Sequence, residues 1–433
     1  YPAFRFSQSQ ASTYAIVAEH DPALLRKIAG RIREGRWEVT ASHWVECDKN
    51  MTGAESLCRQ VLFTRRYMHK LFGLKPDDVP VDWSPDTFGH CATVPTYLSR
   101  GGIRYLYIHR PGVFTASKPG AFWWEGPDGA RVLVRNDMDL GYNGVINSAM
   151  VPHFCKFIRL TGCTDYMFVF GVGDHGGGPT RRDILTGLDM ADWPIFPRLV
   201  FSTARRFFEA LEEQAGRLPV LRGELNTEFA GCYTTQSLIK RSNRIAENRL
   251  LDAETAAVMA SCAAGQTYPA DALYEGWRNT LFSHFHDILP GSGVHDTRTY
   301  THGLYQQTLA LANTREIQSL RLLAATIDTL SGGPPPPASR PPSRSVSAIG
   351  AGVGFRSGEG SLSQAEQSIG HGPRPFVIFN NTAFERTEVV EATIWDNDPM
   401  PERPLQNHTF TVCRPGETSF PAQVTGGGHY WGH

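Results

Sequence analysis

The sequence predicts a parallel α/β domain, either a barrel or an open sheet, followed by a helical bundle and the start of a β-domain. Short apolar segments alternate with amphipathic helical patterns through about residue 217, as in βαβ units. From about residue 238 onward only helical patterns occur. A stretch rich in Gly, Pro, Ser and Arg over 331–374 then separates the helices from two β-like segments.

Residues 1–222 contain the strand-helix alternation and are predicted to form the first domain. The near-continuous apolar run 166–170 is typical of a buried parallel strand. The other expected strands are 37–40, 79–83, 104–108 and 199–201. Expected helices are 55–71, a helix that opens at 94–98, 181–190, and one through 211 that Ser202 is expected to cap.

Residues 223–330 are predicted to form a three-helix bundle. Its antiparallel helices are expected at 238–264, 270–285 and 300–330. Residues 331–374 are the predicted low-complexity linker. Residues 375–433 are predicted to begin a C-terminal β-domain, of the sandwich type, with strands at 376–379 and 388–394.

The composition excludes several classes of protein. A chain of 433 residues is too long for one hydrophobic core, so two or three domains are expected. The net charge of −1 argues against nucleic acid or an anionic membrane as the main partner, and no apolar run is long enough to span a bilayer. The eight cysteines form no CxxC pair, which indicates free thiols in a reducing compartment and predicts a cytoplasmic location.

Three clusters of polar residues follow apolar segments or end a helix, and each has two interpretations. Asp86 comes just after the expected strand 79–83, where a barrel enzyme places a nucleophile or metal ligand; an Asp there would equally cap the next helix. Asp174 lies in the glycine-rich loop after 166–170, as a second carboxylate for acid/base work or as a plain turn residue.

The third cluster begins where the second bundle helix is expected to end. His284 and His286 are two residues apart, so a regular helix would not point both at one metal ion. We favour His286, next to Asp287, as the zinc ligand, against the alternative of a hydrogen-bonded histidine at a helix end.

Together these clusters resemble glycoside hydrolase family 38, the zinc-dependent retaining α-mannosidases, and in particular the bacterial type. The resemblance covers almost the whole chain. The segments that carry it are 5–10, 35–39, 44–46, 53–60, 86–90 (DTFGH), 173–178, 223–225, 233–244 and 283–291 (SHFHDILPG). The resemblance implies a seven-stranded β/α barrel, then a three-helix bundle, then β-domains.

The resemblance also implies roles for single residues. It places the nucleophile, which is also a zinc ligand, on Asp86, and the acid/base carboxylate on Asp174. His286 would be a second ligand of one Zn²⁺ ion, and Asp287 would contact sugar hydroxyls. The substrates implied are mannose-containing glycans or oligosaccharides, and homo-oligomers are common in the family.

Two aromatic residues near these segments are further candidates for substrate binding. Phe88 and Trp44 would pack on the sugar, although both positions suit core packing as well.

One family motif has no equivalent here. The other two zinc ligands of the family lie in a His-x-Asp motif near the first barrel strand, and His20-Asp21 has the wrong spacing. The expectation is therefore that the barrel is incomplete, without its first strand, and that the β-domains are cut short.

The mechanism that follows is a hypothesis. Zinc would hold the cis 2- and 3-hydroxyls of mannose, Asp86 would attack the anomeric carbon, and Asp174 would protonate the leaving oxygen. The two carboxyl groups should then lie roughly 5–5.5 Å apart. The alternatives are a metal-assisted carbohydrate deacetylase, and a non-catalytic carbohydrate-binding fragment, which the absent His-x-Asp motif favours.

Overall fold

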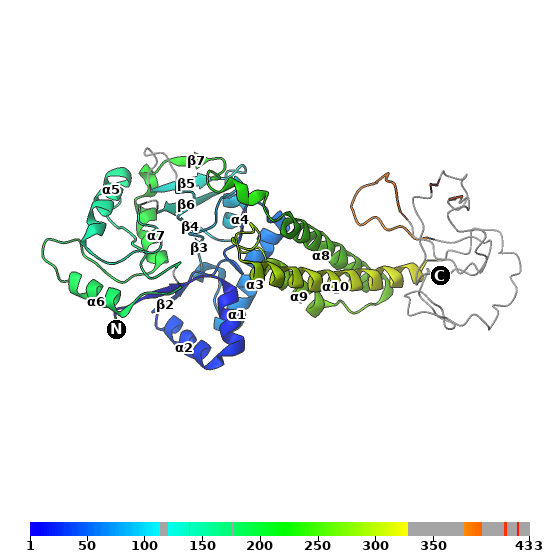
Figure 1. Cartoon of the computed structure of the whole chain (residues 1–433), viewed down its shortest axis with the longest axis horizontal. Helices are drawn as coiled ribbons and strands as arrows, with labels where there is room; N and C mark the ends of the chain where they lie inside the picture. Colours follow the sequence, from blue (N-terminus) through cyan, green and yellow to red (C-terminus); the bar gives the residue numbers. More distant parts are fainter. Residues whose placement is uncertain are drawn as a thin grey trace, which may run out of the picture. The chain divides into compact units, whose positions relative to one another are not determined.

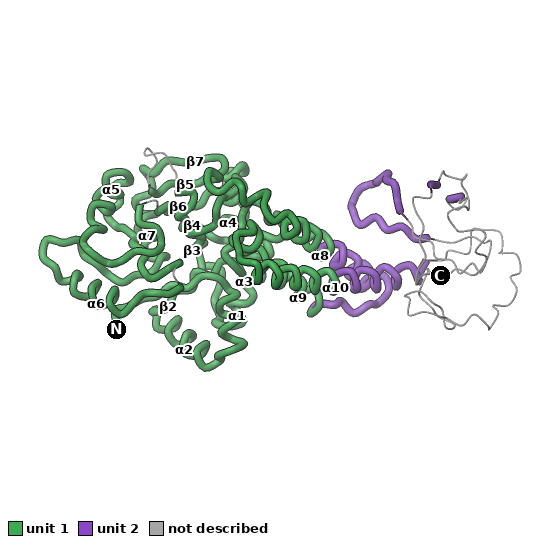
Figure 2. Tube along the Cα trace, viewed as in Figure 1, with its two compact units in different colours: residues 1–250, 271–311 green, residues 251–270, 312–433 purple. Residues whose placement is uncertain are grey.

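The computed structural model describes residues 1–112, 120–137, 139–174, 176–327, 376–391, 411–413 and 422–423. The chain divides into two compact units (Figure 2). The first unit contains Tyr1–Leu250 and Asp271–Leu311, and the second contains Leu251–Ala270 and Ala312–His433. The linker predicted at 331–374 lies outside the described residues.

The strands of the first unit form two sheets (Figure 1). In the smaller sheet, β1 (Phe6–Gln8) pairs in parallel with β2 (Trp37–Val39). The larger sheet has the order β3-β4-β6-β5-β7. Its strands are β3 (Val81–Trp83), β4 (Tyr105–Ile108), β5 (Ala121–Glu125), β6 (Arg131–Asn136) and β7 (Val220–Arg222).

All of these pairs are parallel except β5 with β6, which form an antiparallel hairpin. The predicted α/β class is confirmed. The prediction of an all-parallel pattern is wrong at the hairpin, because the short turn between Glu125 and Arg131 leaves no room for a crossover helix.

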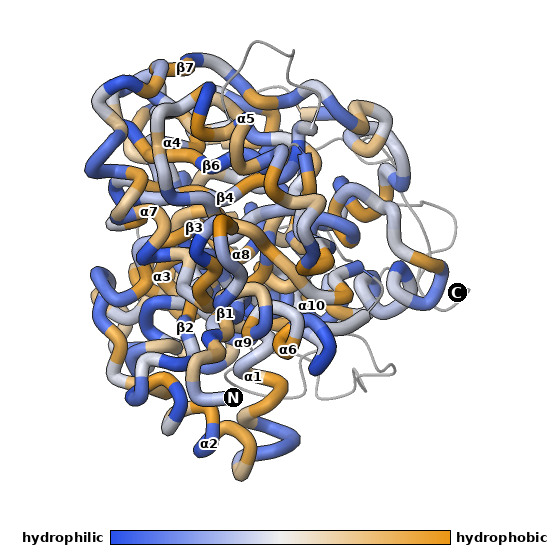
Figure 3. Tube along the Cα trace, turned by 90° about the vertical axis from the view of Figure 1, so that its left-hand side faces the viewer, coloured by the Kyte–Doolittle hydropathy of each residue, from blue (hydrophilic) through white to orange (hydrophobic). Residues whose placement is uncertain are grey.

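Seven helices accompany the strands in the described part of residues 1–222. They are α1 (Ala11–His20), α2 (Pro22–Arg33), α3 (Ala54–Phe72), α4 (Val94–Arg100), α5 (Val151–Thr161), α6 (Arg181–Met190) and α7 (Ala204–Glu213). Hydrophilic and hydrophobic residues alternate along the outer helix α2, which buries Ile28 (Figure 3). The cap of α7 is Thr203, whose hydroxyl accepts the Arg206 N–H, and not the predicted Ser202.

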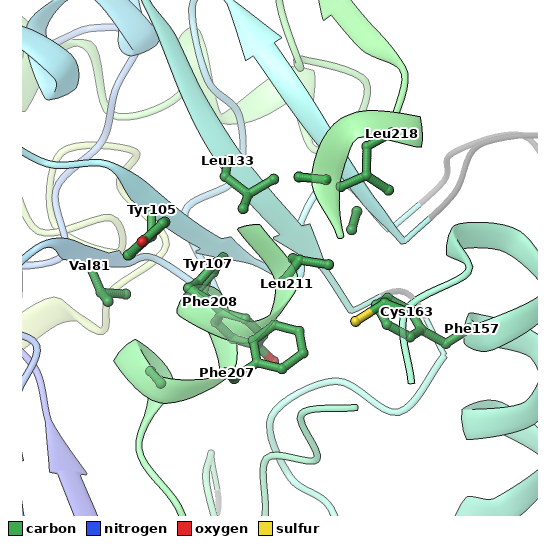
Figure 4. Packing of buried hydrophobic residues seen from close by; sticks show 13 residues of the cluster. Val81, Tyr105, Tyr107, Leu133, Phe157, Cys163, Phe207, Phe208, Leu211 and Leu218 are labelled. Atoms are coloured by element: carbon green, nitrogen blue, oxygen red, sulfur yellow. The ribbon is translucent and has the colours of Figure 1, made fainter. Parts of the chain in front are cut away.

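The larger sheet packs a separate hydrophobic cluster on each face. Side chains alternate along β4, so that Tyr105 and Tyr107 enter one cluster while Leu106 and Ile108 enter the other. The first cluster packs against α5 and α7 through residues such as Phe208 (Figure 4). The sheet is therefore buried on both faces, and its strand ends are the places where polar side chains reach solvent.

Two of the strands predicted within residues 1–222 are absent. The segment 166–170 carries no strand apart from one bridge between Phe170 and Gly144. Its apolar side chains pack instead on the cluster beside α5, where the Tyr166 ring meets the Phe157 ring at 5.4 Å. The segment 199–201 likewise forms no strand, and Phe201 packs against Phe170. In both segments the apolar side chains are buried by packing on other side chains, and the backbone does not pair with a sheet.

Three long helices follow. They are α8 (Ser237–Ala264), α9 (Ala270–Phe282) and α10 (His295–Ala325). Within the first unit they meet at Gly276 of α9, where a Cβ atom would lie 2.8 Å from Leu250 and 3.7 Å from Thr308. Helix α9 ends three residues earlier than predicted, so that residues 283–286 leave the helix and turn toward the strand ends.

The strands predicted at 376–379 and 388–391 are wrong, because the described residues 376–391 form none. Ile378 is 68% exposed and Val389 is 101% exposed, so neither segment buries an apolar face that would stabilise a strand. Residues 392–394 lie outside the described part.

Two composition-based expectations meet the structure directly. All eight cysteines are unpaired, as predicted. Among the described helices, none combines the length and apolarity that a membrane crossing requires.

Candidate active site

Polar side chains gather where the parallel strands of the larger sheet end. Asp86 follows β3, Arg110 follows β4, and Tyr142 follows β6. Because these three strands run in the same direction, their carboxyl ends lie at one edge of the sheet. The structure thus brings together residues that are separated by 24 or more positions in the chain.

The Asp86 carboxylate has a basic partner at each oxygen. Its Oδ1 accepts a hydrogen bond from Nε of Arg110, and its Oδ2 lies 3.3 Å from Nε2 of His286. Burial alone would raise the pKa of Asp86, but the bonds from His286 and Arg110 outweigh it and lower the pKa to about 2. Asp86 is therefore an anion at neutral pH.

His286 reaches Asp86 because residues 46–48 and 284–286 pair as a short antiparallel ladder. Cys47 and Phe285 form its bridge, and the Asp48 N–H donates to the His284 carbonyl at 2.8 Å. Burial would lower the pKa of His286, but the charge of Glu46 and the bond to Asp86 raise it to about 9.

Asp174 approaches Asp86 through a tyrosine that lies between them. The Tyr142 hydroxyl donates to Oδ2 of Asp174 at 3.1 Å, and the Asp86 carboxylate lies close enough to influence the same phenol. Burial raises the pKa of Tyr142 well above its ordinary value, and the two carboxylates add to this effect, so the phenol keeps its proton.

The glycine-rich loop gives Asp174 its position. The Asp174 N–H donates to Oδ1 of Asn143 at 3.2 Å, and Gly173 and Gly177 form an antiparallel bridge. Gly173 has a φ of 60°, and a Cβ atom at this residue would overlap Oδ1 of Asn143. Only glycine permits both this backbone conformation and the close approach of Asn143.

A polar hollow of about 240 Å³ opens beside the carboxylates. It is lined by His109, Arg110, Asp139, Leu140, Gly141, Tyr142, Asn143 and Asp174. A ligand in this hollow would therefore face Asp174 and the guanidinium group that holds Asp86.

The other predicted site residues lie at different distances from this centre. The Phe88 ring packs against His286 at 5.9 Å and against Phe229 at 5.2 Å, so it borders the site. Asp287 follows His286 directly, and its Oδ1 accepts a 2.7 Å bond from the Ser292 hydroxyl. The Trp44 ring is 3% exposed, and the ring contacts described for it are with side chains of α3 and α9. A role for Trp44 in substrate binding stays a prediction without a described contact to the carboxylates.

A metal ion would find two suitable donors here. Asp86 Oδ2 and His286 Nε2 converge at 3.3 Å, and both are ligand types that zinc accepts. Among the described residues, no group of three or more His, Cys, Asp or Glu side chains could hold a metal ion. These residues therefore supply part of a zinc site and do not complete one, because protein zinc sites use three or four protein ligands.

A buried ion pair between Lys49 and Asp82 lies on β3, four residues before Asp86. Asp82 is 1% exposed and accepts a hydrogen bond from Nζ of Lys49, which also donates to the Ser84 hydroxyl at 2.7 Å. His43 Nδ1 lies 3.2 Å from Asp82, and the Ser42 hydroxyl donates to Asp82 at 3.1 Å. Burial would raise the pKa of Asp82, but Lys49 and His43 hold it well below its ordinary range.

Sequence reasoning missed Arg110, Tyr142 and Glu46. Arg110 stands two residues after a strand, the same signal that identified Asp86, so it could have been found. Tyr142 had no such signal, because it lies six residues beyond β6. Glu46 depends on the pairing with the segment 284–286, which the sequence does not reveal.

Comparisons with known proteins cover most of the chain. The family model described as "Glycosyl hydrolases family 38 N-terminal domain" matches residues 1–227. A second model, "Alpha mannosidase middle domain", matches residues 228–323.

Curated relatives and solved structures agree with these matches. Alpha-mannosidase G of Dictyostelium discoideum is 31% identical over 76% of this chain and 30% of its own length. Alpha-mannosidase 2C1 of Homo sapiens is 32% identical over 78% of this chain and 32% of its own length. The chain thus spans about a third of the length of these relatives.

The crystal structure of an alpha-mannosidase from Enterococcus faecalis V583 has the same fold, with a TM-score of 0.65 at 20% identity. It covers 76% of this chain, and 38% of that structure is covered in turn.

Proposed function

Because the chain belongs to glycosyl hydrolase family 38, we propose that its site cleaves α-mannosidic bonds in glycans or oligosaccharides with retention of configuration. The observation that supports this most is that Asp86 and Asp174 both lie beside one tyrosine, Tyr142. Retaining glycosidases need two carboxyl groups at close range, one as nucleophile and one as acid and base.

In the first step, the Asp86 carboxylate attacks the anomeric carbon of mannose. The bond from that carbon to the leaving oxygen breaks, and Asp174 gives the leaving oxygen a proton. In the second step, Asp174 takes a proton from water, whose oxygen attacks the same carbon and releases Asp86. Asp174 suits this exchange because it is exposed beside the polar hollow.

The neighbours of Asp86 prepare it for this role. Arg110 and His286 keep its carboxylate ionised at neutral pH, which a nucleophile requires. The Tyr142 hydroxyl orients Asp174 through its 3.1 Å hydrogen bond and lies beside Asp86.

Asp86 and His286 would be two of the ligands of one zinc ion. Zinc, when bound, would orient the cis 2- and 3-hydroxyls of mannose and offset charge that develops on the sugar.

Asp287 and Phe88 are proposed to contact the sugar, because both adjoin His286. We also propose that the two sheets are arcs of a seven-stranded β/α barrel. Ser42, which follows β2, supports this by donating to Asp82 on β3.

A cytoplasmic location is proposed from the eight unpaired cysteines. A homo-oligomer stays a prediction.

The full chain should hydrolyse an aryl α-mannoside, and ¹H NMR should show the α-anomer as the first sugar released. Asp86→Asn and Asp174→Asn should remove or strongly reduce turnover. Asp128→Asn, at an exposed turn between β5 and β6, is the control and should leave turnover unchanged. First release of the β-anomer would contradict the retaining mechanism.

Zinc content is checked separately by elemental analysis of the purified chain with and without a chelator. Release of acetate from an acetylated sugar, with no cleavage of mannosides, would instead support the deacetylase alternative.

A further inference from the structure

Glu46 contacts both Asp86 and His286, yet the proposed reaction gives Glu46 no chemical step. We propose that Glu46 is a positioning residue that holds the nucleophile and His286 in one mutual geometry. This inference rests on the function proposed above. Glu46 contacts the backbone of Asp86 and the ring of His286, and no contact with the Asp86 carboxylate is described.

The side chain of Glu46 holds the loop that carries Asp86. Its Oε1 accepts the Asp86 N–H at 2.7 Å and the Thr87 N–H at 3.0 Å. The Thr87 hydroxyl lies 3.4 Å from the same oxygen. Two backbone donors on one acceptor fix the two peptide planes on either side of Asp86, and this sets the direction in which the Asp86 side chain leaves the backbone.

The main chain of Glu46 holds His286. Its carbonyl oxygen accepts the His286 N–H at 3.1 Å and lies 3.0 Å from Nδ1 of the same residue. A carbonyl oxygen can only accept, so Nδ1 must carry a proton. The other ring nitrogen, Nε2, is then the one that faces Asp86 Oδ2 at 3.3 Å.

Glu46 is itself held in place by the core. It is 7% exposed, and its N–H donates to Oε1 of Gln10 at 3.2 Å. The two residues before it, Trp44 and Val45, donate their N–H groups to Oε1 of Gln60. A residue whose main chain is anchored in this way can transmit a fixed position to Asp86 and His286.

This geometry requires an oxygen acceptor at the reach of a glutamate side chain, and it does not require a charge. Glu46→Gln keeps the acceptor and its reach while removing the charge. Glu46→Asp keeps the charge but shortens the side chain by one methylene, so that Oε1 withdraws from both N–H groups. The two variants therefore separate position from charge.

Glu38 offers a matched control in the same unit. It is also a glutamate whose carboxylate accepts two backbone N–H groups, those of Ala204 and Arg205, each at 2.8 Å. Glu38→Asp should disturb the start of α7 and leave the Asp86 loop as it is.

The experiment is amide hydrogen exchange of the full chain, with kinetics on an aryl α-mannoside beside it. In Glu46→Asp, exchange at residues 86 and 87 should become about tenfold faster, and kcat should fall by about 10- to 100-fold. Glu46→Gln should restore both to near the wild-type values. Glu38→Asp should change exchange at residues 204 and 205 only.

Unchanged exchange at residues 86 and 87 in folded Glu46→Asp would overturn the proposal. So would a Glu46→Gln variant that loses as much kcat as Glu46→Asp or more, because charge would then be the property that matters. If Glu46→Asp does not fold, loss of protection at residues 86 and 87 in Glu46→Gln overturns it, and retained protection supports it. A wild-type chain that cleaves no mannoside contradicts the proposed function, while the exchange comparison still decides the role of Glu46.

Discussion

Replacing Lys49 by Met tests how much the buried Lys49–Asp82 ion pair stabilises β3, the strand that precedes Asp86. Nζ of Lys49 is buried and donates to Asp82 and Ser84, both within the four residues before Asp86. The variant removes the charge and the donor but keeps a flexible apolar side chain of similar length. Asp82 is then left as a buried carboxylate without its main cation.

The expected cost follows from the remaining partners of Asp82. Removing one member of a buried ion pair costs about 3–5 kcal/mol. Asp82 keeps hydrogen bonds from Ser42 at 3.1 Å and from Ser84 at 3.0 Å, and His43 lies 3.2 Å away. We therefore expect the lower end of that range, a loss of about 3 kcal/mol in the free energy of unfolding at neutral pH.

The loss should depend on pH. Lys49 and His43 hold the pKa of Asp82 below its ordinary value, so this contribution to stability is present above the unfolded pKa and is lost as pH falls through the folded pKa. Without Lys49, the pKa of Asp82 should rise, because burial is the largest influence on it and its main cation is gone. The deficit of the variant should therefore shrink between about pH 7 and about pH 5, as Asp82 takes up a proton.

The assay is urea unfolding followed by tryptophan fluorescence at both pH values. Lys156→Met is the matched control, because Lys156 pairs with Asp139 at 2.7 Å at partly exposed positions and should cost less than about 1 kcal/mol. The double variant Lys49→Met with Asp82→Asn should regain most of the loss. A Lys49→Met variant no less stable than Lys156→Met would refute this reasoning.

Two further predictions concern the site. In Arg110→Met, the Arg110 hydrogen bond is lost, so the pKa of Asp86 should rise from about 2. The acidic limb of kcat/KM should therefore move to higher pH in a profile from about pH 3 to about pH 7. An unmoved limb would show that Arg110 does not control the ionisation of Asp86. Gly173→Ala should lower kcat about tenfold more than Gly176→Ala. Both glycines have positive φ, but only the Cβ atom added at residue 173 would overlap Asn143. Equal losses of kcat in the same assay would mean that backbone strain alone is responsible.

Most helices, and the strands β3 and β4 that precede Asp86 and Arg110, could be predicted from the sequence. The periodic helices α3, α6 and α8 lie within one or two residues of the prediction. Asp86 could be identified because polar residues that follow parallel strands gather at one edge of the sheet. His286 could be identified because it follows the end of a predicted helix, α9.

The remaining features depend on contacts that local patterns do not contain. The run 166–170 has the composition of a buried strand, but its side chains pack against α5 and it lacks a partner strand. The β5–β6 hairpin did have a signal, since Pro127, Asp128 and Gly129 form its turn. The position of Glu46 depends on pairing with residues 240 positions away, which no local pattern encodes.

The central claim is that Asp86 is the nucleophile, and trapping of the glycosyl-enzyme tests it most directly. The full chain is treated with a mechanism-based fluorinated mannosyl fluoride, digested, and mapped by mass spectrometry, with Asp86→Asn as the control. We expect one mannosyl adduct per chain on the peptide that contains Asp86, and none in Asp86→Asn. An adduct on Asp174, or continued turnover by Asp86→Asn, would contradict the claim.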